Sequence, residues 1–144
     1  MNPKLNSTWW ALRIGLGLVP FLAGLDKFFN ILTDWSIYLG PVVASLLPVS
    51  GEVFMRAVGV IEMAVGLLIL VGYTRVGGYI AAAWLVAIAV NLVSTGNFLD
   101  VAVRDLLIAL AAFTMARLSE VRDTADSRGR VPDSLGLGRA RAGA

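Results

Sequence analysis

The sequence predicts an all-α fold: a transmembrane four-helix bundle with an interfacial or re-entrant segment between the first two helices. The chain is 58% hydrophobic with a mean hydropathy of +0.78, whereas soluble domains are about half apolar. Charged residues make up only 15% of it. Four apolar runs reach the length of about 20 residues that a helix needs to cross a bilayer. Open strands are excluded as spans, because their edges would leave backbone groups unpaired in lipid.

The predicted spans differ in how they are connected. Short turns join the second to the third and the third to the fourth, so these helices are expected to be antiparallel neighbours. The longer segment 30–52 contains Trp35 and Tyr38, and its apolar piece 42–47 is too short to span. We expect this segment to lie along the membrane interface or to dip partly into it. The four spans are predicted at residues 8–29, 53–72, 76–94 and 98–118.

The distribution of Lys and Arg predicts the orientation. Lys4, Arg75 and the arginines of the C-terminal tail fall on one side, and segment 28–55 on the other side has no basic residue. Cytoplasmic loops carry the excess of basic residues, so both termini are expected in the cytoplasm. The domain prediction is a transmembrane unit over 1–118 and a flexible basic tail over 119–144, which is too polar to fold alone.

Three features of the sequence narrow the range of functions expected of the chain. The chain has no cysteine and no histidine, so thiolate or imidazole metal sites and haem ligation through these residues are not expected. Its basic residues are not interleaved with exposed aromatics, so nucleic acid is not an expected partner. The first apolar run is long, contains Arg13 and lacks a good cleavage site, which favours a retained helix over a signal peptide.

Ionisable residues inside the predicted spans are the candidate site. A charge within a spanning helix costs about 2.5–3.5 kcal/mol on insertion scales, so each one needs a reason. Most of them fall in the outer half of the membrane, beneath segment 30–52. The predicted ligand-binding residues are Asp26, Lys27, Arg56, Glu62, Asn91, Asp100, Arg104 and Asp105.

Helical spacing predicts which of these residues face the bundle. At about 100° per residue, Glu62 shares one face of the second helix with Gly59 and Gly66, with Arg56 at its edge. Small residues allow close helix approach, so we expect Glu62 to be buried in protein. The first helix has a similar stripe, consisting of Arg13, Gly17, Pro20, Gly24 and Lys27.

Other polar and aromatic residues receive simpler interpretations. Asp100 and Arg104 are four residues apart and can pair along one helix. We expect Arg13 to extend to the headgroups and Trp9 to anchor the interface. Trp84 is expected to serve packing.

Three roles stay open for the intramembrane charges. Ion pairs can lock helices together, with no ligand involved. Alternatively, the charges form a site for a ligand or a quinone headgroup, or they conduct protons or ions.

The chain resembles the DoxX family of small four-helix membrane proteins. The matching pieces are Gly24-Leu25-Asp26-Lys27-Phe28, which closes the first helix, and the stretch 59–75. In that stretch Glu62 is followed by Gly66, an apolar run, Gly72 and the turn Thr74-Arg75. The resemblance covers about residues 13–118 and implies a four-helix bundle associated with quinone-linked redox complexes.

The resemblance implies an accessory subunit, or a quinone- or lipid-binding component, of a redox system in the inner (cytoplasmic) membrane. Without a redox centre we expect no autonomous catalytic activity. The expected partners are membrane lipid and either an oxidoreductase complex or further copies of the chain. One alternative is a small oligomeric transporter or proton-linked permease, and another is a structural assembly factor.

Overall fold

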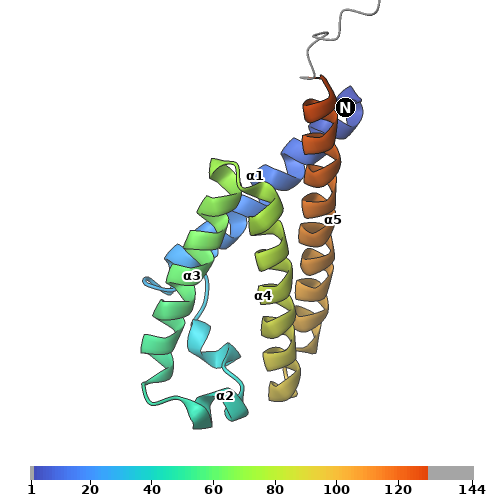
Figure 1. The fold of residues 1–144 in the computed structure, drawn as a ribbon. Coiled ribbons are helices and arrows are strands. Elements are labelled where there is room, and N and C mark those ends of the chain that lie inside the picture. The colour runs from blue at the N-terminus through green and yellow to red at the C-terminus, as the bar shows by residue number, and fades with distance from the viewer. Residues whose placement is uncertain (1, 130–144) are drawn as a thin grey trace, which may run out of the picture.

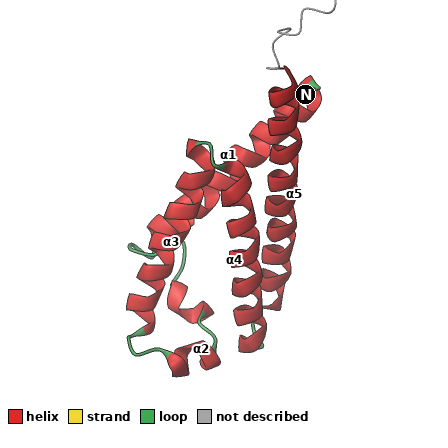
Figure 2. Cartoon of the chain, viewed as in Figure 1, coloured by secondary structure: helices red, strands yellow, loops and turns green. Residues whose placement is uncertain are grey.

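The computed structural model describes residues 2–129, which form helices and loops and contain no β-strand. This confirms the predicted all-helical class. The helix α5 continues through 119–129, where the sequence predicted the start of a flexible tail, and the remaining residues of that predicted tail, 130–144, lie outside the described part. The elements are α1 (Pro3–Asp26), the 3₁₀ helix η1 (Trp35–Tyr38), α2 (Pro41–Leu46), α3 (Gly51–Val71), α4 (Thr74–Thr95) and α5 (Leu99–Gly129) (Figures 1 and 2).

Local sequence signals set the ends of the long helices. The side chains of Asn2 and Ser50 cap α1 and α3 by accepting hydrogen bonds from backbone N–H groups of the first turn. Gly72 ends α3 with a φ of +121°, and Gly96 ends α4 with a φ of +71°. Glycine adopts these angles without the steric cost of a Cβ atom, so both turns depend on it.

Close packing of glycines joins α1 to α3. A Cβ atom on Gly24 would lie 2.5 Å from the carbonyl oxygen of Gly59, and one on Gly66 would lie 2.5 Å from that of Gly17. The two backbones therefore touch at these positions, as small residues permit. The sequence predicted that each of these glycine faces turns into the bundle, and the structure shows that the two faces contact each other.

The helices enclose two apolar clusters. The first lies near the α3–α4 turn and brings together residues of α3, α4 and α5, with Leu12 and Leu16 of α1 packed against it. The second lies toward the α4–α5 turn and contains Ala89, Leu92 and Ala102. Tyr38 of η1 packs on this second cluster, because α3 and α4 diverge there and η1 and α2 lie between them (Figure 1).

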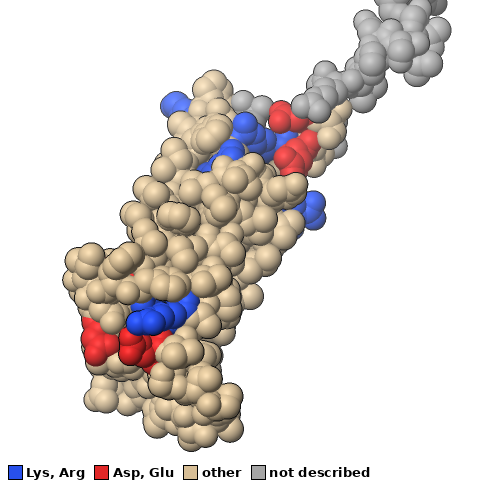
Figure 3. All heavy atoms as spheres, turned by 90° about the vertical axis from the view of Figure 1, so that its left-hand side faces the viewer, with Lys and Arg blue, Asp and Glu red and all other residues tan. Residues whose placement is uncertain are grey.

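The three helices α1, α3 and α4 are long and apolar enough to cross a membrane. In α5 the apolar run is interrupted near its start by Asp100, Arg104 and Asp105. On the face shown in Figure 3 the charged side chains gather in two zones, with a broad uncharged band between them. This is the surface expected of a membrane protein.

Candidate functional site

A buried ion pair joins α1 to α3. Lys27 Nζ donates to Glu62 Oε2 at 2.6 Å, and only 4% and 10% of the two side chains are exposed. The pair forms beside the contact of Gly24 with Gly59. A Cβ atom on Gly24 would lie 3.0 Å from Cβ of Glu62, and one on Gly59 would lie 3.0 Å from Cβ of Lys27. Because Gly24 and Gly59 have no side chains, they leave space in which the side chains of Lys27 and Glu62 can meet.

The pair lies near the middle of α3. At a rise of 1.5 Å per residue, Glu62 is roughly 16 Å from the first residue of α3 and about 14 Å from its last. A hydrocarbon core is about 30 Å thick. The sequence likewise places Glu62 near the middle of its helix. A charge at such a position in a spanning helix is rarely found without a partner.

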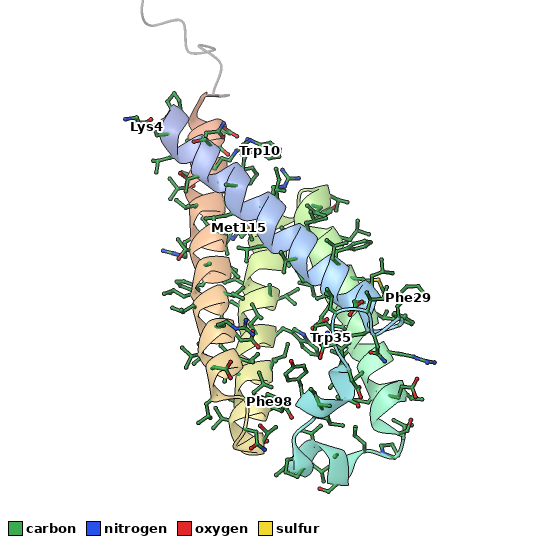
Figure 4. All side chains as sticks on the ribbon, turned by 180° about the vertical axis from the view of Figure 1, so that it is seen from behind. Lys4, Trp10, Phe29, Trp35, Phe98 and Met115 are labelled. Atoms are coloured by element: carbon green, nitrogen blue, oxygen red, sulfur yellow. The ribbon has the colours of Figure 1, made fainter. Side chains whose placement is uncertain are left out.

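Trp35 and Asp26 complete the surroundings of Lys27. The Trp35 ring lies over Lys27, with 3.7 Å from Nζ to the ring centroid, an attractive cation–π arrangement. Asp26 fixes Trp35 by accepting a hydrogen bond from its Nε1 at 2.9 Å. The same carboxylate accepts from the backbone N–H groups of Ile31 and Leu32, each at 3.0 Å. In Figure 4 Trp35 lies between the α1–α3 pair and α4, whereas Phe29 points outward.

Two further polar groups lie close to the pair. Trp84 of α4 lies near Glu62, and its buried Nε1 has no hydrogen-bond partner in the described structure. Asp105 of α5 is half-buried and near enough to interact electrostatically with Glu62 and Lys27. The site therefore combines groups from α1, α3, α4, α5 and η1, and the indole N–H of Trp84 has no hydrogen-bond partner in the described structure.

Asn91 holds the segment between α1 and α3 in place. Its Nδ2 donates to the carbonyl of Tyr38 at 2.7 Å, and its Oδ1 accepts from the N–H of Gly40 at 2.9 Å. Gly40 fits here because a Cβ atom would collide with Ser94 and with Asn91. Asn91 therefore positions the backbone that carries Trp35, and it does not reach the ion pair through any hydrogen bond that the structure describes.

Replacing Asn91 with leucine should loosen this segment. Each lost hydrogen bond is worth about 1 kcal/mol, so amide exchange in a peptide covering 36–44 should rise by about tenfold or more. Hydrogen–deuterium exchange with mass spectrometry measures this. Asn97→Leu is the control, because Asn97 is exposed and its bonds are confined to Thr95. Unchanged exchange in the Asn91 variant would contradict the assigned role.

Several predicted site residues do not join the pair. Arg56 is exposed and pairs with Glu52 at 2.6 Å, one helical turn away. Asp100 and Arg104 are exposed, and the predicted ion pair between them is absent from the described structure. The structure brings together Lys27 and Glu62, places Asp26 and Asp105 beside them, and leaves the other three charges at the surface.

Several aromatic residues have roles that the sequence did not indicate. Trp35 was expected at the headgroups and Trp84 in plain packing, yet both adjoin the charged pair. Trp9, expected as an interfacial anchor, is 5% exposed and donates to Ser119. Arg13 was expected to reach the headgroups, but it donates to the carbonyls of residues 69 and 70 at the end of α3. The described residues contain no group of three or more acids that could hold a metal ion.

Comparison with known proteins gives a family match. The model of the DoxX family matches residues 8–95, which run from the second turn of α1 to the end of α4 and include Asp26, Lys27 and Glu62. No curated protein and no solved structure matched the chain.

Proposed function

The chain belongs to the DoxX family, and on that premise we propose that it binds the polar headgroup of a quinone or a related lipid at the Lys27–Glu62 pair. In this proposal it is an accessory component of a redox system in the inner membrane, with no catalytic activity of its own. The acceptor would be a carbonyl-type oxygen, because the donors present are the Lys27 ammonium and the Trp84 indole.

The proposal includes a fourth span and an orientation. Helix α5 packs along α4 over an extended contact, so its apolar part would cross the bilayer beside α4. Arg75 and Arg117 both pair with Glu120 near one end of the molecule, and Lys4 lies toward the same end (Figure 4). The positive-inside rule assigns this end to the cytoplasm. Segment 30–50 would then enter from the opposite side, shielded by α3 and α4 as non-helical backbone in a membrane requires.

The unused N–H of Trp84 is the observation that carries this proposal. A buried donor without a partner costs roughly 1–3 kcal/mol, and the indole lies near Glu62. A headgroup oxygen placed between Trp84 and Lys27 would take a hydrogen bond from each. Trp35 covers Lys27, so entry requires the Trp35 ring to move aside, and its hydrogen bond to Asp26 sets the position to which it returns.

A conservative variant of Trp84 tests the proposal. Trp84→Phe keeps the ring but loses the N–H, so the full-length protein should bind a short-chain ubiquinone analogue about tenfold more weakly. Equilibrium binding of the radiolabelled analogue to protein in detergent measures this. Trp10→Phe is the matched control, because Trp10 is 40% exposed and lies at the other end of the molecule. Equal affinity of the wild type and both variants would reject the proposal.

A structural role is the second candidate, because Lys27 and Glu62 satisfy each other within hydrogen-bond distance. A charge swap separates the two roles. The double variant Lys27→Glu, Glu62→Lys preserves an ion pair between α1 and α3, but it moves the ammonium to the other helix. A purely structural pair predicts that binding of the analogue, as well as the fold, is unchanged by the swap. The headgroup proposal predicts that the fold is kept and the binding is lost.

A further inference from the structure

A cavity lies at the opposite end of the molecule from the Lys27–Glu62 pair, where α3 turns into α4. Its volume is about 240 Å³, the share of roughly eight water molecules, so it admits a small polar headgroup. We propose that it binds the headgroup of an aminophospholipid, with the phosphate against Arg75 and the ammonium against Asp123. The cavity is lined by Trp9, Gly72, Tyr73, Thr74, Arg75, Val76, Ser119 and Asp123.

The walls of this cavity are held by specific hydrogen bonds. Trp9 Nε1 donates to Ser119 Oγ at 2.8 Å, which fixes α1 to α5. The Thr74 hydroxyl donates to the carbonyl of Ile69 at 3.3 Å and is 2% exposed. These contacts join parts of the chain that are distant in sequence. The cavity is therefore built by the tertiary fold and not by one flexible loop.

The charges on one side of the cavity leave a positive excess. Arg75 and Arg117 share a single carboxylate, that of Glu120, at 3.2 and 2.6 Å. The Tyr79 hydroxyl donates to Glu120 and, together with these arginines, lowers the pKa of its carboxyl, so Glu120 stays ionised at neutral pH. One carboxylate compensates one of the two arginines. Arg75 is the arginine that lines the cavity and is 57% exposed, so it is available to a phosphate.

Arg122 adds to this positive charge from α5. Its guanidinium lies 3.9 Å from the ring centroid of Trp9, which is one of the residues that line the cavity. One of its terminal nitrogens is buried and has no hydrogen-bond partner in the described structure. An anion in the cavity would be stabilised by this charge without direct contact.

Asp123 gives the cavity its second charge. It is exposed and forms no ion pair within the described residues. A headgroup that carried only negative charge would be repelled by this carboxylate. A primary ammonium next to the phosphate would instead pair with it and donate hydrogen bonds, which a quaternary ammonium cannot do.

The surface beside the cavity favours a lipid over a soluble ligand. Val76 lines the cavity, and Val76 and Ile80 are one helical turn apart on α4, with exposed fractions of 52% and 43%. Val71 is 61% exposed, and the exposed Tyr73 is a residue type found at the membrane–water interface. Acyl chains attached to a headgroup in the cavity would lie along this apolar surface.

Lipid binding to the full-length protein tests the proposal. Native mass spectrometry in detergent would compare short-chain phosphatidylethanolamine, phosphatidylcholine and phosphatidylglycerol, and soluble phosphoethanolamine. Phosphatidylethanolamine should bind about fivefold more tightly than the other two lipids, and soluble phosphoethanolamine more weakly than any lipid. Equal binding of the three lipids, or soluble phosphoethanolamine binding as tightly as the lipid, would overturn the proposal.

Two variants test which part of the headgroup each charged residue binds. Asp123→Asn should abolish the preference for phosphatidylethanolamine over phosphatidylcholine, and Arg75→Gln should weaken binding of all three lipids. Asp126→Asn and Arg104→Gln are the matched controls, because both residues are exposed and neither lines the cavity. Circular dichroism checks that every variant retains its helices. A preference that persists in folded Asp123→Asn would also refute the assignment.

Discussion

Replacing Lys27 with methionine should destabilise the protein more than any other single change of a charged residue. Glu62 would keep its buried position, at 8% exposure, but lose the ammonium that lies 2.6 Å away. Removing one partner of a buried ion pair costs about 3–5 kcal/mol, because the remaining charge is uncompensated. Unfolding of the purified protein in mixed detergent micelles, followed by circular dichroism, measures the loss.

Two further variants test whether the loss of stability comes from the unpaired charge of Glu62. The double variant Lys27→Met, Glu62→Leu removes both charges and should recover most of the stability, since apolar replacements of buried ion pairs are often neutral. Arg56→Gln breaks the exposed pair with Glu52 and should cost no more than about 1 kcal/mol. A double variant as unstable as Lys27→Met, or an equal loss for Arg56→Gln, would show that the buried pair has no special weight.

Gly66→Ala is expected to have the second largest effect. The new Cβ atom would lie 2.5 Å from the carbonyl oxygen of Gly17 and 2.9 Å from the backbone nitrogen of Phe21. Backbone atoms cannot rotate away as a side chain can, so α1 and α3 would have to move apart. Overpacking of this kind costs roughly 1–3 kcal/mol, which the same unfolding measurement detects.

Gly15→Ala is the matched control for this prediction. Gly15 lies on α1, and a Cβ atom there would meet nothing within 4 Å. Alanine is a better helix former than glycine by about 1 kcal/mol, so this variant should be unchanged or slightly more stable. If both alanine variants behaved alike, the close contact between α1 and α3 would not be a determinant of stability.

The long helices and their inward faces could be predicted because both depend on local sequence. Apolar runs of spanning length identify helices, and the spacing of Gly59, Glu62 and Gly66 identifies one face. That face does contact α1, and Glu62 is buried as expected. The identity of its partner could not be predicted in the same way. Lys27 was one of several nearby cations, and the rotation and tilt of α1 against α3 decide which one reaches Glu62.

The position of Arg56 could have been judged better from the sequence. Arg56 and Glu62 are six residues apart, so at 100° per residue they lie about 120° apart around the helix. Glu52, one turn away from Arg56, offers it a partner on the same helix. The structure shows this local pair. An ion pair along the helix forms without a particular tertiary arrangement, so it takes precedence over a distant partner.

The position of Trp35 could not be predicted, because no periodic pattern governs the segment that carries it. Its ring is placed by the Asp26 carboxylate and, further along, by the bonds of Asn91 to Tyr38 and Gly40. Each of these contacts depends on the tertiary fold. The expectation that Trp35 lies at the headgroups rests on residue type alone and says nothing of its contacts with Lys27 and Asp26.

Photo-crosslinking tests most directly whether a quinone-type headgroup binds at the Lys27–Glu62 pair. A ubiquinone analogue with a photoreactive group on its ring would be irradiated with the full-length protein in membranes, and the labelled peptides identified by mass spectrometry. Binding at the pair predicts labels on the peptides that contain Trp35 and Trp84. These labels should be displaced by unlabelled analogue and lost in the double variant Lys27→Met, Glu62→Leu. Labelling elsewhere, or undiminished labelling of the folded double variant, would contradict it.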